Sequence, residues 1–324
     1  MALPTRNTAV VGSAQTIRPS ATALFSVNSA DRFRSYAEER TGVSSPYDFV
    51  IRKGENLLTG FFSRIGLTEV RFPLMLPNVS GSTTKIRVVY NTGGGDITTI
   101  LDVPVAFYTP SDIAAYIQGE LQAIPGLGLA TFTYGQPPTA NLPVFAYATN
   151  NATTLAFRPM VEDATPGAGY FPFDNTWIQL FDMLGFDDVN QVLTLGSYGH
   201  NTLFQKYTAF DIVSTILTGN QALKDATSAQ IDRNVVARIY VVDESSQHLP
   251  SSDPNFAPAG TTPYVLYRQF NTPKQIAWDG RQPISQLNFQ VFDADGHLLG
   301  SDLTSQELRV LRSEFQLSLL VSEN

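Results

Sequence analysis

Short segments in which β-branched and aromatic residues alternate with polar ones recur along the chain from about residue 47 onward. Clear examples are 85–91 (KIRVVYN), 96–101 (DITTIL) and 286–293 (QLNFQVFD). Clusters of Gly, Pro, Asn and Ser separate these segments, which is typical of strands joined by turns and loops. About a dozen segments of this kind predict a mainly β protein.

One segment has helical rather than strand periodicity. Thr109 can cap a helix that begins at Pro110, and Asp112 occupies the third helical position, as in a capping box. Apolar side chains then recur at helical spacing, at Ile113, Ile117, Leu121 and Ile124. Pro125 and Gly126 end the pattern. A second short helix is predicted within 175–186, so we expect one or two short helices in all.

Numerous strands that do not alternate with helices favour a β-sandwich or jelly roll over a parallel α/β sheet. Long loops, such as 194–207 and 243–263, suit a protein that reaches neighbouring molecules. Residues 1–45 lack a sustained period of either kind. We therefore expect an extended N-terminal arm over 1–45, followed by a β domain over 46–324.

Composition narrows the class of partners. The formal net charge of −8, without clustered Lys and Arg, argues against a sequence-specific nucleic-acid surface. Charged residues make up 15% of the chain, against about 25% in ordinary soluble domains. Aromatic residues make up 11%, and this mixture suits extensive protein contacts. No apolar run is long enough for a transmembrane segment, and the absence of cysteine excludes disulfides and cysteine-ligated zinc.

No arrangement of residues predicts catalysis. The three histidines are isolated from one another, at His200, His248 and His297. The nucleophile elbow, the phosphate-binding loop and the zinc-protease helix motif are all missing. Carboxylates do cluster, at Asp182, Asp187 and Asp188 and at Asp243 and Glu244, but an acidic chain produces such clusters by chance. We therefore expect a protein that is not an enzyme, with no catalytic, cofactor-binding or metal-binding residues and no cofactor.

Residues 293–296 (DADG) resemble the start of a calcium-binding loop. An EF-hand loop needs oxygen ligands at its positions 1, 3 and 5, Gly at position 6 and Glu at position 12. Counted from Asp293, the glycine falls at position 4, position 5 is His297 and position 12 is Thr304. The sequence therefore predicts a tight turn at this point rather than a metal site.

Two asparagines, Asn78 and Asn151, match the pattern for N-glycosylation. Residues 1–20 do not form a secretory signal, because their apolar run is short and contains Gly12 and Ser13. We therefore interpret both matches as incidental.

Several segments, in this order along the chain, resemble penton (minor capsid) proteins of virophages, polinton-like viruses and related eukaryotic double-stranded DNA viruses. The longest are 272–299, from TPKQIAW through the DADG turn, and the final strand at 314–324 (EFQLSLLVSEN). Earlier segments contribute 27–32 (VNSADR), 65–80, 107–122 with its Tyr-Thr helix start, and 181–186 (FDMLGF). Each match is short, and the order of the matches along the chain is the main support for the resemblance.

The resemblance implies a structural virion protein located in the capsid. It implies a jelly-roll subunit that forms a homopentamer at the icosahedral vertices and contacts the surrounding major capsid protein, with other minor capsid proteins as further candidate partners. It implies no catalytic residues. The chain is longer than a minimal single jelly roll, which leaves room for an inserted β subdomain around 126–220.

Three alternative functions stay open on the sequence. A double jelly-roll major capsid subunit and a minor cementing protein between capsomers are structural roles that the chain length also allows. A carbohydrate-binding β-sandwich belongs to another class, since Trp177, Trp278 and the many tyrosines could supply stacking faces for sugars.

Overall fold

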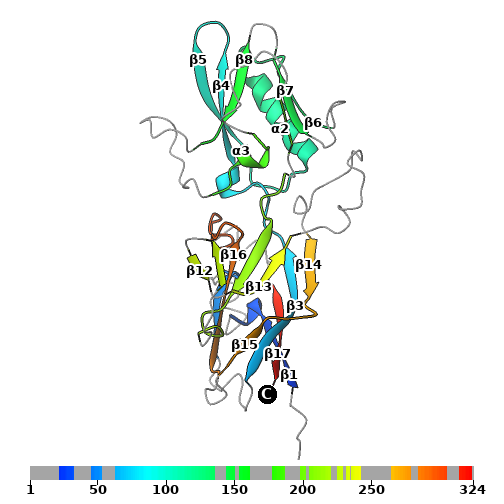
Figure 1. The fold of residues 1–324 in the computed structure, drawn as a ribbon. Helices are drawn as coiled ribbons and strands as arrows, with labels where there is room; N and C mark the ends of the chain where they lie inside the picture. The colour runs from blue at the N-terminus through cyan, green and yellow to red at the C-terminus, as the bar shows by residue number, and fades with distance from the viewer. Residues whose placement is uncertain are drawn as a thin grey trace, which may run out of the picture.

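The computed structural model shows two packed units arranged end to end (Figure 1). It describes residues 22–32, 45–52, 63–135, 144–149, 153–160, 177–186, 198–201, 204–219, 225–228, 231–233, 235–241, 264–278, 284–304 and 314–322. One unit is a β-sandwich, and the other is an inserted unit that the chain builds between two of the sandwich strands.

The first sheet of the sandwich has the strand order β1-β17-β3-β14, and the short strand β15 also pairs with β3. Its strands are β1 (Thr22–Asn28), β17 (Gln316–Ser322), β3 (Arg64–Leu74), β14 (Tyr264–Gln269) and β15 (Gln275–Ala277). All neighbours are antiparallel. The sheet therefore joins the two ends of the chain, because β1 pairs with the last strand.

The second sheet has the order β13-β10-β16-β2 and is also antiparallel. Its strands are β13 (Val235–Tyr240), β10 (Ala209–Val213), β16 (Gln286–Asp293) and β2 (Asp48–Arg52). A separate two-stranded hairpin, β11 (Asp225–Ser228) with β12 (Ile231–Arg233), lies between β10 and β13 in the sequence.

The pairing pattern is that of a jelly roll. If β14 and β15 count as one interrupted strand, the first sandwich strand pairs with the last, the second with the seventh, the third with the sixth and the fourth with the fifth. A long antiparallel hairpin that rolls up into two facing sheets produces this order. The predicted fold class, a mainly β jelly-roll sandwich with short helices, is therefore confirmed.

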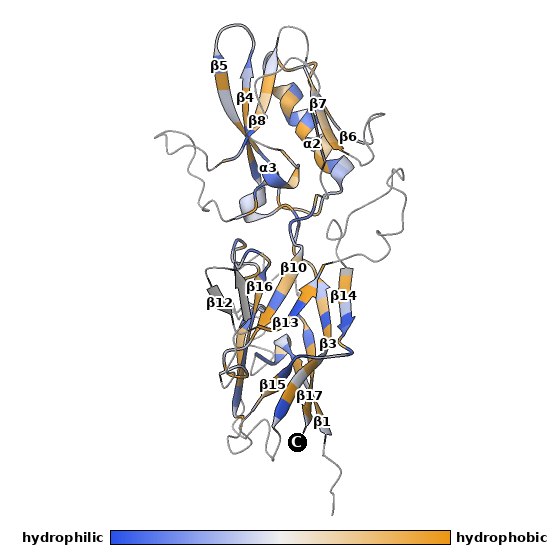
Figure 2. Ribbon diagram, in the orientation of Figure 1, coloured by the Kyte–Doolittle hydropathy of each residue, from blue (hydrophilic) through white to orange (hydrophobic). Residues whose placement is uncertain are grey.

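The sandwich core lies between the inward faces of the two sheets, as strict alternation requires. In β16, Leu287, Phe289 and Val291 are buried, and the residues between them are partly exposed. Aromatic rings fill the centre, where the Phe72 ring lies 5.0 Å from that of Phe210 and 5.5 Å from that of Phe315, measured between centroids. In Figure 2 the hydrophobic positions alternate with hydrophilic ones along these strands.

The inserted unit occupies the chain between Leu74, where β3 ends, and Ala209, where β10 begins. It contains two three-stranded antiparallel sheets, with the orders β5-β4-β8 and β6-β7-β9. Their strands are β4 (Lys85–Asn91), β5 (Asp96–Asp102), β6 (Thr131–Gly135), β7 (Val144–Ala148), β8 (Thr154–Arg158) and β9 (Tyr198–Asn201). Its hydrophobic cluster is separate from that of the sandwich.

Helix α2 (Pro110–Ala123) packs in the inserted unit and confirms the predicted helix. Thr109 Oγ1 accepts a hydrogen bond from the Asp112 backbone N–H at 3.2 Å, which completes the predicted capping box. The predicted apolar face is buried, at Ile113, Ile117 and Leu121. The second predicted helix is a single turn, α3 (Leu180–Met183), followed by Gly185 at a positive φ of 74°.

Two predicted boundaries differ from the structure. Residues 22–28, assigned to the arm of 1–45, form β1 and pair with β17, and a short 3-10 turn, η1 (Ser29–Arg32), follows them. The segment that leaves the sandwich starts after Leu74 rather than near residue 126, and it ends before residue 220. Periodicity identifies strands but does not say which sheet each strand joins, so both boundaries depended on long-range pairing.

The strand register places the inserted unit and the chain ends at opposite ends of the sandwich. Ser322 pairs with both Thr22 and Arg64, so residues 22 and 322 lie together at the end where β3 starts. Leu74, at the other end of β3, leads into the inserted unit. Figure 1 shows the inserted unit above the sandwich and the C-terminal end below it.

Candidate functional site

The candidate catalytic residues that the structure describes are not brought together. Within the described residues, no three His, Asp or Glu side chains gather where they could hold a metal ion. Asp182 lies in the first turn of α3, where its Oδ2 accepts a hydrogen bond from the Gln179 backbone N–H at 2.8 Å. Burial raises the pKa of the Asp182 carboxyl. His200 lies on β9, and His248, Asp187, Asp188, Asp243 and Glu244 lie outside the described residues.

The DADG segment is a turn. Asp293 Oδ1 accepts hydrogen bonds from the backbone N–H groups of Gly296, at 2.7 Å, and His297, at 2.8 Å. Gly296 has a φ of 102°, which glycine adopts without strain. The carboxylate that could have bound a cation instead satisfies the backbone of its own turn.

This turn lies at the junction between the two units. The His297 ring stacks on the Trp177 ring, with 3.7 Å between centroids and 15° between planes. Trp177 lies three residues before the start of α3 in the inserted unit, and His297 follows β16 in the sandwich. The turn therefore supplies a stacking partner that joins the units.

A buried ion pair forms the centre of the same junction. Lys206 Nζ lies 2.5 Å from Asp302 Oδ2, and their side chains are only 3% and 2% exposed. Lys206 Nζ also donates to Ser80 Oγ at 2.7 Å and to the Ser80 backbone carbonyl at 3.0 Å. Burial lowers the pKa of the Lys206 ammonium, and the Asp302 carboxylate acts in the opposite direction. The ammonium thus contacts a sandwich loop and the start of the inserted unit at once.

The backbone beside Ser80 is shaped to fit Asp302. Gly81 opens the 3-10 turn η2 (Gly81–Thr83) with a φ of 48°, and a Cβ atom at this position would lie 2.5 Å from Asp302 Cβ. Only glycine avoids this overlap, because carbon atoms do not approach so closely without displacement of the chain. Gly81 therefore allows the two units to approach.

Asn78 stabilises the entry into the inserted unit. Its side chain is buried, and it exchanges two hydrogen bonds with the Tyr108 backbone: Nδ2 donates to the carbonyl at 2.8 Å, and Oδ1 accepts from the N–H at 2.9 Å. A glycan has no access to this side chain, so the pattern match at Asn78 is incidental, as predicted. Asn151 lies outside the described residues.

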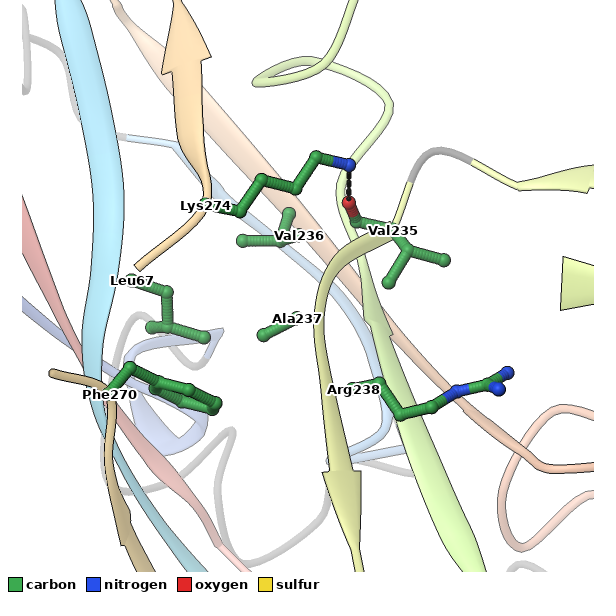
Figure 3. A pocket seen from close by; sticks show the side chains of 7 residues that line it. All are labelled: Leu67, Val235, Val236, Ala237, Arg238, Phe270 and Lys274. Atoms are coloured by element: carbon green, nitrogen blue, oxygen red, sulfur yellow. Dashed lines mark hydrogen bonds between the residues drawn. The ribbon is translucent and has the colours of Figure 1, made fainter. Parts of the chain in front are cut away.

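A cavity opens on one edge of the sandwich, between β13 and the segment that connects β14 to β15 (Figure 3). Its volume is about 340 Å³, and its lining is mostly apolar. Leu67 and Phe270 form one side, and Val236 and Ala237 face them. Lys274 spans the opening, and its Nζ donates to the Val235 backbone carbonyl at 2.9 Å. Burial lowers the pKa of the Lys274 ammonium.

The cavity results from an interruption in the edge of the first sheet. β14 pairs with β3 from Glu69 to Leu74, and β15 pairs with β3 from Arg64 to Gly66. Between them the chain leaves the ladder, and the register of β17 on β3 shifts at the same level. Leu67 therefore faces a gap where an uninterrupted strand would have continued.

Exposed apolar side chains of the sandwich lie on the strands that end its sheets. Among the described residues, the large exposed hydrophobic side chains of the sandwich are Leu24 on β1, Val50 on β2, Tyr240 on β13, and Val265 and Tyr267 on β14. β1 and β14 end one sheet, and β13 and β2 end the other. The inner strands contribute none to this group, so the lateral edges are the apolar part of the sandwich surface.

Sequence reasoning did not find the junction or the cavity. Lys206, Ser80 and Asp302 lie far apart in the sequence, and both Ser80 and Asp302 occur in ordinary polar loops. The one available signal was the positively charged Lys206 within the apolar segment 203–210, where a lysine requires a partner. No sequence signal predicts the cavity, which forms where two separate strands, β14 and β15, pair with the same strand, β3.

The α-helices of the described residues are α2 and α3. Neither is long and apolar enough to cross a membrane. No protein-family model and no curated protein matches the sequence. One solved structure with which the chain aligns is the crystal structure of selenomethionine-labelled mavirus penton protein. The alignment covers 93% of this chain and 99% of that chain, at 12% identity and a TM-score of 0.48. The jelly-roll assignment rests on the strand order and register of the chain itself.

Proposed function

We propose that this chain is a structural virion protein, a penton subunit that forms a homopentamer at the icosahedral capsid vertices and contacts the surrounding major capsid protein. The observation that carries the proposal is the location of the exposed apolar side chains on the four terminal strands of a jelly roll. A subunit of a closed ring is contacted on two sides, and both lateral edges of this sandwich offer apolar contact area.

The arrangement of the two units supports an orientation in the capsid. The junction holds the inserted unit at one end of the sandwich, and residues 22 and 322 lie at the other. In this proposal the inserted unit projects outward, and the end of the sandwich that holds residues 22 and 322 lies toward the particle interior. Contacts with neighbouring subunits then add to the stability that the core supplies.

Two alternatives receive less support. In the described residues, the inserted unit has two three-stranded sheets around a helix and lacks the eight paired strands of a second jelly roll, which disfavours a double jelly-roll major capsid subunit. For the carbohydrate-binding alternative, one face of Trp177 is covered by His297, and Trp278 packs against the sandwich core. Both tryptophans are only partly exposed, so each offers a sugar less surface than an open aromatic platform would.

A reconstruction of the assembled particle tests the proposal. We expect density for the jelly roll, with its inserted unit outward, in five copies around each fivefold axis. Density between capsomers away from the vertices would assign the chain to a cementing role, and a copy number equal to that of the main capsomer would assign it to the major capsid protein. Either result would contradict the penton proposal.

A further inference from the structure

The outer strand β1 lacks the features that protect a free sheet edge. Its sequence, Thr22–Asn28, contains no charged residue and no proline, and Leu24 on its outer face is 65% exposed. The other three terminal strands each carry at least one charge, such as Arg268 on β14. Natural proteins place charges, proline or bulges on edges that stay uncovered, because bare strand edges pair with other chains. β1 therefore has the character of a covered edge.

The opposite edge of the sandwich carries a mostly apolar hollow. β1 and β2 lie on one edge, where the turn that follows β1 packs against β2. β13 and the β14–β15 segment lie on the other, where the cavity of about 340 Å³ opens between the sheets. Since apolar cavities of about 150 Å³ already accommodate benzene, this one has room for a leucine side chain.

We propose that the β1–β2 edge of one subunit packs against the β13–β15 edge of the next copy, with Leu24 seated in the cavity lined by Leu67, Ala237 and Phe270. The inference rests on the proposed homopentamer and deepens it by naming the two contacting surfaces. A contact between two different surfaces of the same chain is heterologous, and heterologous contacts close into rings when the rotation permits.

Leu24 is favoured over Val50 as the inserted side chain because of its neighbours. On the outer face of β1, Leu24 lies between Thr22 and Ser26, which are small and uncharged. On β2, Val50 lies between Asp48 and Arg52, which are exposed charges. Transfer of a charged neighbour out of water costs far more than transfer of a hydroxyl group. β1 can therefore enter an apolar site at lower cost, while Val50 lies at the margin of the contact.

The absence of cysteine from the chain makes a direct test possible. A double variant, Leu24→Cys with Ala237→Cys, places one thiol on each proposed surface. Disulfides form only when the two Cα atoms come within about 7 Å, so mild oxidation reports proximity. We expect a ladder of covalent oligomers that ends at five chains, and no such ladder from either single variant. Leu129→Cys with Ala237→Cys is the matched control, since Leu129 is 72% exposed in the inserted unit.

The outcomes separate this inference from the proposed function. If the protein is pentameric but the Leu24–Ala237 pair gives no ladder, the named surfaces are wrong and the pentamer stands. A dimer from the single Leu24→Cys variant would indicate a twofold contact and would also overturn the inference. A protein that stays monomeric and is absent from the vertices would overturn the proposed function itself. If protomers are isolated singly, the same oxidation on assembled particles gives the same answer.

A second variant measures what the side chain contributes. Leu24→Ser should raise the protein concentration at which half of the assembly dissociates by at least about tenfold, because each contact loses a buried leucine. Leu129→Ser should leave this concentration unchanged. Equal behaviour of the two variants would show that Leu24 is outside the contact.

Discussion

At the scale of single residues, the Lys206–Asp302 pair carries a desolvation cost on both side chains, which are 3% and 2% exposed. Two charges leave water to form it, and the lowered pKa of Lys206 reflects that desolvation. A pair of this kind contributes little net stability compared with apolar residues of similar volume. We interpret it as the contact that fixes the orientation of the inserted unit on the sandwich.

Replacement of one partner of the Lys206–Asp302 pair should therefore lower the free energy of unfolding more than replacement of both partners. Lys206→Met leaves the Asp302 carboxylate buried without its cation and should lower the free energy of unfolding by about 3–5 kcal/mol. The double variant Lys206→Met with Asp302→Leu should recover a large part of that loss. Chemical denaturation of the purified variants measures both effects.

The exposed pair Lys85–Asp102 provides the matched control. Its atoms lie 3.6 Å apart, and the side chains are 42% and 68% exposed. Lys85→Met should change the free energy of unfolding by no more than about 1 kcal/mol. If Lys206→Met and Lys85→Met have equal effects, the role assigned to the buried pair is wrong.

At the scale of secondary structure, local pattern predicted the elements whose determinants lie close together in the sequence. The capping residues and apolar spacing of α2 fall within 109–124, and the helix begins and ends as predicted. The turn at Asp293 was predicted for the same reason. The sequence did not predict that β1 belongs to a sheet, because its partner β17 lies at the other end of the chain. The interruption between β14 and β15, which creates the cavity, also depends on their shared partner β3.

The cap of α2 offers a test at this scale. Thr109→Ala removes the side chain that accepts from the Asp112 N–H, so the unfolding free energy of the inserted unit should fall by about 1 kcal/mol. Ser111→Ala, at an exposed position one residue into the same helix, is the control and should have little effect. Thermal unfolding followed by circular dichroism would distinguish them. Equal melting temperatures for Thr109→Ala and the unmodified protein would contradict the capping role.

At the scale of the whole molecule, the inserted unit lies at one end of the sandwich, and residues 22 and 322 lie at the other. The inserted unit carries the β4–β5 hairpin, whose tip contains Gly93, Gly94 and Gly95 with open space around each. Residues 22 and 322 pair at the opposite end of the sandwich. The jelly-roll class and an inserted subdomain around 126–220 were predicted from the sequence, but the bounds of the inserted unit and its location were not, since strands of both units have the same periodicity.

The proposed orientation predicts which end antibodies can reach. An epitope inserted at Gly94 should be tolerated and should bind its antibody on intact particles, because a side chain added at Gly94 would meet no described atom within 4 Å. The same epitope placed after residue 322 should become accessible only when particles are opened. The reverse pattern would show that the inserted unit faces inward.

The mass of the purified full chain in solution, measured by light scattering during size-exclusion chromatography, tests the central claim most directly. The account predicts a species of about five times the 35.4 kDa chain mass, which dissociates on dilution. A mass of one chain that persists at high protein concentration, together with absence of the protein from the particle vertices, would contradict it.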